Sequence, residues 1–226
     1  MRTRERWGAL LLLADTVQFF LVQIVVAAAW TTPYSWSRNW ISDLGNTGCG
    51  QFAISQSAPE YVCSPRHDLM NVSFVLNGVL FLIGGLALMG LFPAGRLRTW
   101  GRWLLAVSGV LKILVGLAPE NVNAGLHLLG AANVPVGAVA ILLLSLALRD
   151  RPPVRGLGVV VAVISLGAAF LSTAAQASGN LALTLGLGNG GLERVADYPA
   201  FAWMIAVALL ALTAGRVPAR RPAPVA

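Results

Sequence analysis

Six long apolar runs, separated by short polar connectors, leave this chain few folds to choose from. They lie at roughly residues 8–30, 68–92, 100–118, 125–148, 155–177 and 196–215. A helix needs about 20 apolar residues to cross the hydrocarbon core of a bilayer. Because lipid offers backbone groups no hydrogen-bonding partners, such runs are expected to be helical. The sequence therefore predicts an all-α polytopic membrane protein, a six-transmembrane-helix bundle.

The charge content supports this class. Only 11% of the residues are charged, whereas a soluble domain carries about 25%. The formal net charge of +7 does not indicate nucleic-acid binding, because the arginines are spread over the connectors instead of clustering on one polar domain. The first run is longer than the apolar core of a signal peptide, which has about 7–15 residues, so we expect it to remain as the first span.

The arginines predict the orientation of the bundle. One set of connectors holds twelve of them: Arg2, Arg4, Arg6, Arg96, Arg98, Arg102, Arg149, Arg151, Arg155, Arg216, Arg220 and Arg221. The opposite set holds three: Arg38, Arg66 and Arg194. Under the positive-inside rule we expect the N-terminal residues 1–7 and the basic tail 216–226 to be cytoplasmic, with the membrane domain over 8–215 between them. The arginine-rich, lysine-poor composition is typical of a GC-rich bacterium, so the expected location is a bacterial plasma membrane.

The loop between the first and second runs holds both cysteines, Cys49 and Cys63. The predicted orientation places this loop on the extracytoplasmic side, where oxidising conditions favour a disulfide. Closing a loop of about 15 residues contributes roughly 3 kcal/mol in the chain-entropy model. We therefore expect a disulfide-closed first extracytoplasmic loop.

Titratable and polar side chains gather near the predicted outer ends of the spans. The candidate catalytic residues are Asp43, His67, Glu120 and His127, and the candidate binding residues are Ser42, Asp68, Asn71, Lys112, Asn123, Glu193 and Arg194. Helix axes in a bundle lie about 8–10 Å apart, so a compact bundle would bring these ends together. Polar groups recessed in a membrane bundle are costly and tend to mark function. The pattern predicts an outward-facing polar pocket.

Lys112 lies deep within the third apolar run, where an unpaired charge would be expensive. We expect it either to pair with Asp15 or Glu120, or to join the outer site. Pro135 lies within the fourth run and predicts a kinked helix there.

The pattern leaves three functions open. The first is binding or handling of a lipid or amphiphile, with Arg194 or Lys112 holding an anionic group. The second is a membrane-embedded hydrolase, in which His67, His127 and Asp43 would hold a divalent metal and its activated water. A metal-free version would use Asp43 or Glu120 as the base together with His127. The third is a structural or assembly protein whose polar residues only pair with one another.

Several of these motifs together resemble a known family. They are the NWISDLG stretch at 39–45, the asparagines of the second run, Pro119-Glu120, and the Gly-Leu-Glu-Arg stretch at 191–194. Over about residues 8–215 they resemble the bacterial and archaeal family catalogued as domain of unknown function 998, which implies a six-span fold and no established activity. The turn after the first run is more loosely similar to the DRAM and Sfk-type six-span proteins, which are associated with lipid handling.

A third comparison concerns the alkaline-ceramidase-like membrane hydrolases, which use a serine, an aspartate and three histidines around zinc. Ser42, His67, Asp68 and His127 match that pattern in part. The chain has only two histidines and no HxxxH motif, so it departs from the pattern at the metal ligands.

Overall fold

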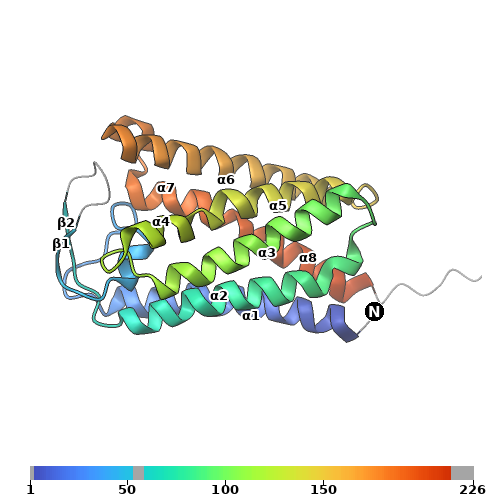
Figure 1. Ribbon diagram of the computed structural model, residues 1–226, viewed down its shortest axis with the longest axis horizontal. Coiled ribbons are helices and arrows are strands. Elements are labelled where there is room, and N and C mark those ends of the chain that lie inside the picture. The colour runs from blue at the N-terminus through green and yellow to red at the C-terminus, as the bar shows by residue number, and fades with distance from the viewer. Residues whose placement is uncertain (1–2, 53–58, 215–226) are drawn as a thin grey trace, which may run out of the picture.

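The computed structural model describes residues 3–52 and 59–214, which form a bundle of long helices (Figure 1). Within these residues, six helical segments are long and apolar enough to cross a membrane. They run over Thr3–Ala28, His67–Leu91, Arg96–Leu117, Ala124–Ala147, Pro152–Ser178 and Gly188–Thr213. The predicted all-α polytopic bundle is confirmed. Arg2 and the predicted basic tail at 216–226 lie outside the described residues.

Four of the six segments are built on one α-helix each. They are α1 (Thr3–Ala28), α2 (His67–Ala87), α3 (Arg96–Leu117) and α6 (Pro152–Ser178), and the short 3-10 helix η2 (Leu88–Leu91) extends α2. Neighbours in sequence pack side by side: α1 on α2, and α2 on α3. Glycines allow this close approach, since a Cβ at Gly78 of α2 would lie only 2.6 Å from the carbonyl oxygen of Gly109 on α3.

The other two segments are broken by proline. The fourth consists of α4 (Ala124–Ala131) and α5 (Asn133–Ala147), and the sixth of α7 (Gly188–Asp197) and α8 (Pro199–Ala214). A proline clashes with the carbonyl four residues before it and cannot donate to it. Pro135 therefore interrupts the helix after Ala131, as the sequence predicts, and α7 ends at Asp197, two residues before Pro199.

The first loop contains a small antiparallel sheet. Strand β1 (Gly50–Phe52) pairs with β2 (Glu60–Val62), and Gly50 lies opposite Val62. The Cys49–Cys63 disulfide joins the residues next to this pairing, which confirms the predicted bond. The loop also holds the 3-10 helix η1 (Ser42–Gly45), and a further 3-10 helix, η3 (Leu181–Thr184), lies between α6 and α7.

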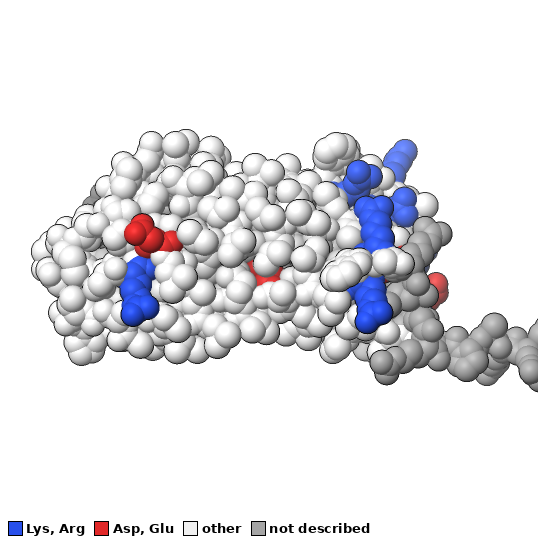
Figure 2. All heavy atoms as spheres, turned by 90° about the horizontal axis from the view of Figure 1, so that it is seen from below, with Lys and Arg blue, Asp and Glu red and all other residues white. Residues whose placement is uncertain are grey.

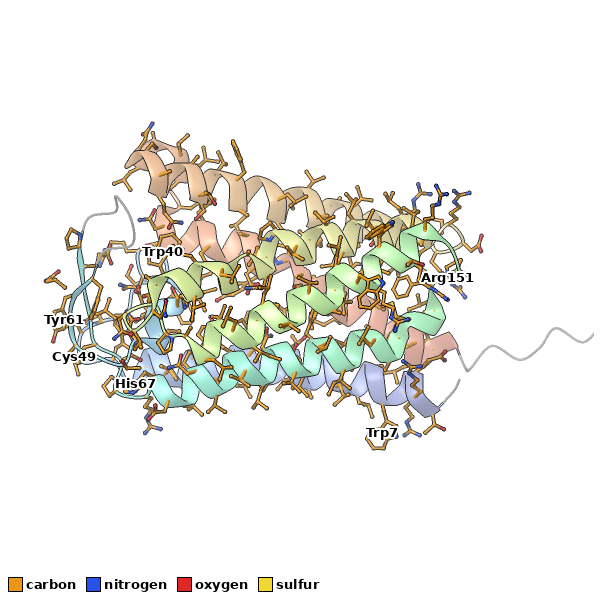
Figure 3. The ribbon with its side chains drawn as sticks, viewed as in Figure 1. Trp7, Trp40, Cys49, Tyr61, His67 and Arg151 are labelled. Carbon is orange, nitrogen blue, oxygen red and sulfur yellow. A yellow bond between two sulfur atoms is a disulfide. The ribbon has the colours of Figure 1, made fainter. Side chains whose placement is uncertain are left out.

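The two ends of the bundle differ in charge. On the face shown in Figure 2, lysine and arginine side chains gather at one end, and the surface between the ends is white except for one small acidic patch. Trp7 and Arg151 lie at this arginine-rich end, whereas Trp40, Cys49, Tyr61 and His67 lie at the opposite, disulfide-bearing end (Figure 3). The six long apolar helices describe a multi-pass membrane protein.

Candidate functional site

The segment from Tyr34 to Asn46, called the capping segment below, is held at the disulfide-bearing end by hydrogen bonds from several helices and loops. Its residues Ile41 to Asn46 are all buried and include η1. Helix α2 holds it through Asn71, whose Nδ2 donates to the carbonyl oxygen of Gly45 at 2.9 Å. Helix α7 holds it through Glu193, whose Oε2 accepts from the backbone N–H of Ile41 at 2.5 Å. The buried loop thus draws its partners from distant helices.

Glu120, in the loop between α3 and α4, completes the docking of η1. Its Oε2 accepts from Ser42 Oγ at 2.7 Å, and its Oε1 accepts from Asn46 Nδ2 at 2.9 Å. A further hydrogen bond joins it to the carboxyl of Asp43. Burial raises the pKa of Glu120 above its usual range. Burial and the neighbouring Glu120 charge raise the pKa of Asp43 to about 9.

The pair therefore shares a proton at neutral pH. Asp43 Oδ2 accepts the backbone N–H of Trp40 at 2.7 Å, and its carboxyl group is hydrogen-bonded to that of Glu120. Neither Asp43 nor Glu120 lines the cavities described below. The arrangement stabilises the loop, and it keeps both carboxyl groups of the predicted catalytic set occupied with protein partners.

Arg194 on α7 clamps the beginning of the capping segment. Its Nη1 donates to the carbonyl oxygens of Asn39 at 2.9 Å and Gly190 at 2.8 Å, and its Nη2 donates to the hydroxyl of Tyr34. The guanidinium also lies over the rings of Tyr34 and Trp36, with its Cζ 5.5 and 5.0 Å from their centroids. Only 8% of Arg194 is exposed, so its guanidinium contacts protein groups and has little contact with solvent.

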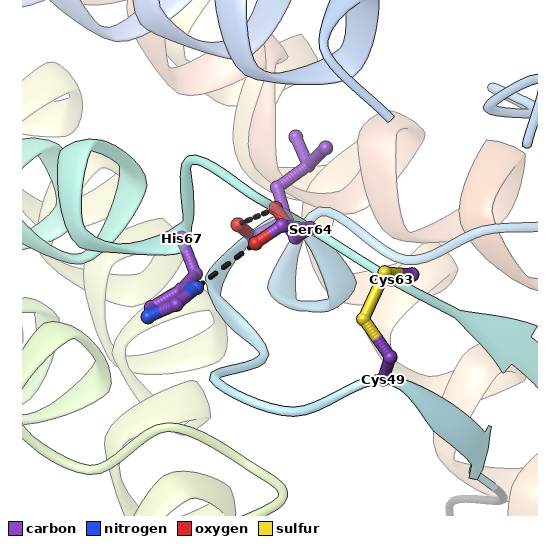
Figure 4. Close-up of a disulfide and its surroundings, with 5 residues drawn as sticks. Cys49, Cys63, Ser64 and His67 are labelled. Carbon is purple, nitrogen blue, oxygen red and sulfur yellow. Dashed lines mark hydrogen bonds between the residues drawn. A yellow bond between two sulfur atoms is a disulfide. The ribbon is translucent and has the colours of Figure 1, made fainter. Parts of the chain in front are cut away.

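His67 and the disulfide lie together at the entrance to α2. His67 Nδ1 lies 2.9 Å from the carbonyl oxygen of Ser64, whose own Oγ donates to the carbonyl of Leu44 in η1 (Figure 4). His67 Nε2 lies 3.3 Å from Asp68, whose side chain is 93% exposed. An ion pair that is this exposed contributes little stability. These contacts give His67 a role in the local fold.

A groove of about 440 Å³ opens between the two broken segments and α6. Leu128 and Ala131 of α4 form one side, and Thr173 and Gln176 of α6 form the other. Leu128 is 51% exposed on the outside of the bundle, so the mouth lies on a surface that carries apolar side chains. The remaining lining residues are Trp40, Ser42, His127, Ala132, Val134, Pro135, Ala169, Ser172, Ala177, Glu193 and Ala196.

A smaller chamber of about 70 Å³ lies behind the groove. Both cavities are lined by Ser42, His127, Ala131, Val134 and Glu193, so the chamber adjoins the groove. His127 Nδ1 lies 2.9 Å from the carbonyl oxygen of Ala118. Because a carbonyl only accepts, this nitrogen carries the hydrogen, and Nε2 of the neutral ring is an acceptor.

The deep wall of the chamber carries an ion pair within the membrane-spanning part. Lys112 Nζ on α3 lies 3.3 Å from Asp197 Oδ1 at the end of α7, and the two side chains are 12% and 11% exposed. The rings of Phe81 and Phe201 flank the ammonium group, each centroid 5.9 Å from it. The partner of Lys112 is thus Asp197. Neither of the two partners that the sequence suggested, Asp15 and Glu120, forms this contact.

Residues 16–210 match the family described as Protein of unknown function (DUF998). The chain belongs to this family. No curated protein and no solved structure gives a significant match. For this DUF998 protein the resemblance seen in its motifs is therefore confirmed, and the looser similarity to DRAM and Sfk-type proteins stays a prediction.

The predicted site residues of the DUF998 chain fall into separate groups. The chamber is lined by Ser42, Lys112, His127 and Glu193. His67 and Asp68 instead contact each other at the start of α2, and they line neither cavity. Asn123 accepts from the backbone N–H of Leu126 and caps α4. In the described part of the chain, no three His, Cys, Asp or Glu side chains come together as a metal site requires. The predicted set of His67, His127 and Asp43 is therefore not assembled.

Three polar residues of the chamber, Asn77, Asn133 and Asp197, were missed by sequence reasoning. Asp197 lies at the start of the sixth apolar run, and a search for a partner of Lys112 would have found it. Asn133 lies two residues before Pro135, at the break between α4 and α5. Polar residues at a break in a membrane helix often line a cavity, and this signal was available in the sequence.

Proposed function

We propose that this protein binds an amphiphile of the membrane in the groove between α4 and α6, with the polar end of the amphiphile in the adjoining chamber. The observation that carries the proposal is the cavity pair itself: a large, mostly apolar groove of about 440 Å³ leads to a small chamber with charged walls. This gradient from apolar to polar matches the two ends of an amphiphile.

The side on which the groove opens supports a ligand that arrives from the bilayer. Leu128 and Leu129 of α4 are 51% and 55% exposed, and on α6 Phe170 is 72% exposed. These side chains would contact acyl chains in a membrane, because apolar surface of this extent is normal only where lipid covers it. A ligand can then enter sideways, with its chains remaining in contact with lipid.

Photocrosslinking tests this proposal. The protein is placed in nanodiscs of phosphatidylethanolamine, phosphatidylglycerol and phosphatidylcholine that contain a phosphatidylethanolamine with a photoreactive acyl chain, and adducts are located by mass spectrometry. We expect adducts on the α4 and α6 walls of the groove. Ala131→Trp fills the mouth and should remove most of them, since Ala131 is exposed and lines both cavities.

Leu129→Trp is the matched control. Leu129 lies on the same helix and is 55% exposed, but it does not line either cavity. This variant should crosslink like the wild type. Adducts spread evenly over the lipid-facing helices, with no response to Ala131→Trp, would contradict binding in the groove.

We also infer that the disulfide-bearing end faces away from the cytoplasm of a bacterial cell. The support is the gathering of arginines at the opposite end. In a Cys49→Ser/Cys63→Ser background, Arg151→Cys should react with a membrane-impermeant maleimide in inverted vesicles. In intact spheroplasts it should be protected, and labelling there would overturn the orientation.

A further inference from the structure

The walls of the chamber have more carboxyl groups than amino groups. Glu193 and Asp197 line it, and Lys112 is the only cation among its described lining residues. Asp15 adds a third carboxyl group, which lies within Coulombic range of both Lys112 and Asp197. Arg194 is a second cation close to Glu193, and its guanidinium donates hydrogen bonds to the capping segment and does not line the chamber. A group that enters the chamber therefore meets carboxyl oxygens, which accept hydrogen bonds from N–H and O–H donors.

The chamber also offers hydrogen-bond acceptors. Asn133 is 6% exposed and lines the chamber, and its Oδ1 accepts no hydrogen bond from any described residue. Its Nδ2, in contrast, donates to the carbonyl oxygen of Gly130. A buried acceptor without a donor costs free energy, so this oxygen favours a ligand that brings an N–H or O–H group.

The two proline breaks add further negative potential. Helix α4 ends at Ala131 and helix α7 ends at Asp197, and both residues line the chamber. The C-terminal end of a helix carries a partial negative charge and unsatisfied carbonyl groups. The carbonyl of Ala131 has lost its usual donor four residues on, because that residue is Pro135. Broken helices use such ends to hold cations in membrane proteins.

Size distinguishes between cationic groups. One water molecule needs at least about 10–15 Å³ of cavity volume, so a chamber of about 70 Å³ holds only a few water molecules. A primary ammonium group is about the size of one water and brings three N–H donors. A trimethylammonium group is several-fold larger and brings none, so it would leave the acceptors unpaired.

We propose that the chamber selects amphiphiles with a primary amine head group, which it holds through Glu193, Asp197 and Asn133. This inference rests on the proposed binding of an amphiphile in the groove and names the chemical class of its head group. Acyl chains would occupy the groove, and the ammonium group would replace part of its hydration shell with the carboxylate and amide oxygens of the chamber.

A head-group competition series tests the selection. Unlabelled phosphatidylethanolamine, its N,N-dimethyl derivative and phosphatidylcholine, all with identical acyl chains, compete with the photoreactive lipid in the nanodisc assay. As ammonium groups these lipids have three, one and no N–H donors. We expect phosphatidylethanolamine to compete at least about ten-fold better than phosphatidylcholine, with the dimethyl lipid between them.

Two variants connect the preference to the chamber. Glu193→Gln keeps an oxygen for the N–H of Ile41 but replaces the carboxyl group with an amide, and Asn133→Leu removes the free acceptor. Each should flatten the series to within about three-fold. Thr173→Val, on the groove wall and outside the chamber, is the control and should keep the full preference. A preference that survives both chamber variants overturns the proposal.

The outcomes separate the two proposals. Equal competition by all three lipids, with crosslinking still blocked by Ala131→Trp, leaves amphiphile binding intact and refutes head-group selection. Crosslinking that never localises to the groove refutes both. If sodium chloride raises the thermal midpoint against matched choline chloride while the lipids compete equally, the chamber holds an inorganic cation and the amine proposal fails.

Discussion

The ion pair between Lys112 and Asp197 gives the sharpest test of how this bundle is held together. The two groups are 3.3 Å apart, and only 12% and 11% of their side chains are exposed. Removing one partner of a buried pair leaves the other charge uncompensated, which costs about 3–5 kcal/mol. The best test compares Lys112→Met with Asp197→Asn, because both substitutions keep the shape of the side chain.

The structure predicts that the two substitutions are unequal. Lys112→Met leaves Asp197 and Asp15 without their nearby cation, whereas Asp197→Asn leaves Lys112 with Asp15 still in Coulombic range. We expect Lys112→Met to cost about 3 kcal/mol or more, and Asp197→Asn about half of that. For a chain of this size, 3 kcal/mol lowers the thermal midpoint by roughly 6–12 °C.

Tryptophan fluorescence during heating of the purified protein in one detergent measures these shifts. Val110→Met, on the exposed side of α3, is the control for the new methionine and should move the midpoint by less than about 2 °C. The double variant should cost less than the sum of the singles. Two single variants with unchanged midpoints, or a larger loss for Asp197→Asn than for Lys112→Met, would refute the reasoning.

Three further predictions concern the fold. First, the folded pKa of Asp43, about 9 against an ordinary value of 3.8, means that the folded state binds more protons between these pH values. Stability should therefore fall as pH rises from 5 to 9, by at most about 1.4 kcal/mol per unit, and Asp43→Asn should flatten this slope in a pH series of thermal midpoints. Second, reducing Cys49–Cys63 should lower stability by roughly 3 kcal/mol; calorimetry with and without reductant checks this, and a Cys49→Ser/Cys63→Ser variant should no longer respond. Third, Gly78→Ala should destabilise the protein by about 1–3 kcal/mol, because the new Cβ would meet the α3 backbone. Gly167→Ala, where a Cβ meets nothing within 4 Å, should be neutral or stabilising in the same thermal assay.

The bundle could be predicted because its signal is local. A run of about 20 apolar residues must satisfy its own backbone hydrogen bonds in lipid, and a helix does this with no help from the rest of the chain. The break near Ala131 follows from Pro135 for an equally local reason. The family resemblance, which rested in part on the motif at 39–45, was also confirmed.

The candidate site was only partly predictable, because proximity in the sequence says little about which helices meet. Asp43 and Glu120 do meet, but as a pair that fastens the capping segment. His67 contacts Ser64 and Asp68. Arg194 donates hydrogen bonds to the hydroxyl of Tyr34 and to the backbone of the loop. Each of these outcomes depends on the direction in which a helix presents its side chain, which span boundaries alone do not reveal.

The sequence by itself determined that this protein is a six-helix membrane bundle with a disulfide-closed loop, because hydrophobic length and the two cysteines suffice for that. Only the tertiary structure decided that Lys112 pairs with Asp197, and that a groove between α4 and α6 leads to a chamber with charged walls. The physical reason is that a cavity forms where neighbouring helices separate. The breaks at the ends of α4 and α7 lie next to side chains from distant parts of the chain, and no local pattern in the sequence shows which side chains these are.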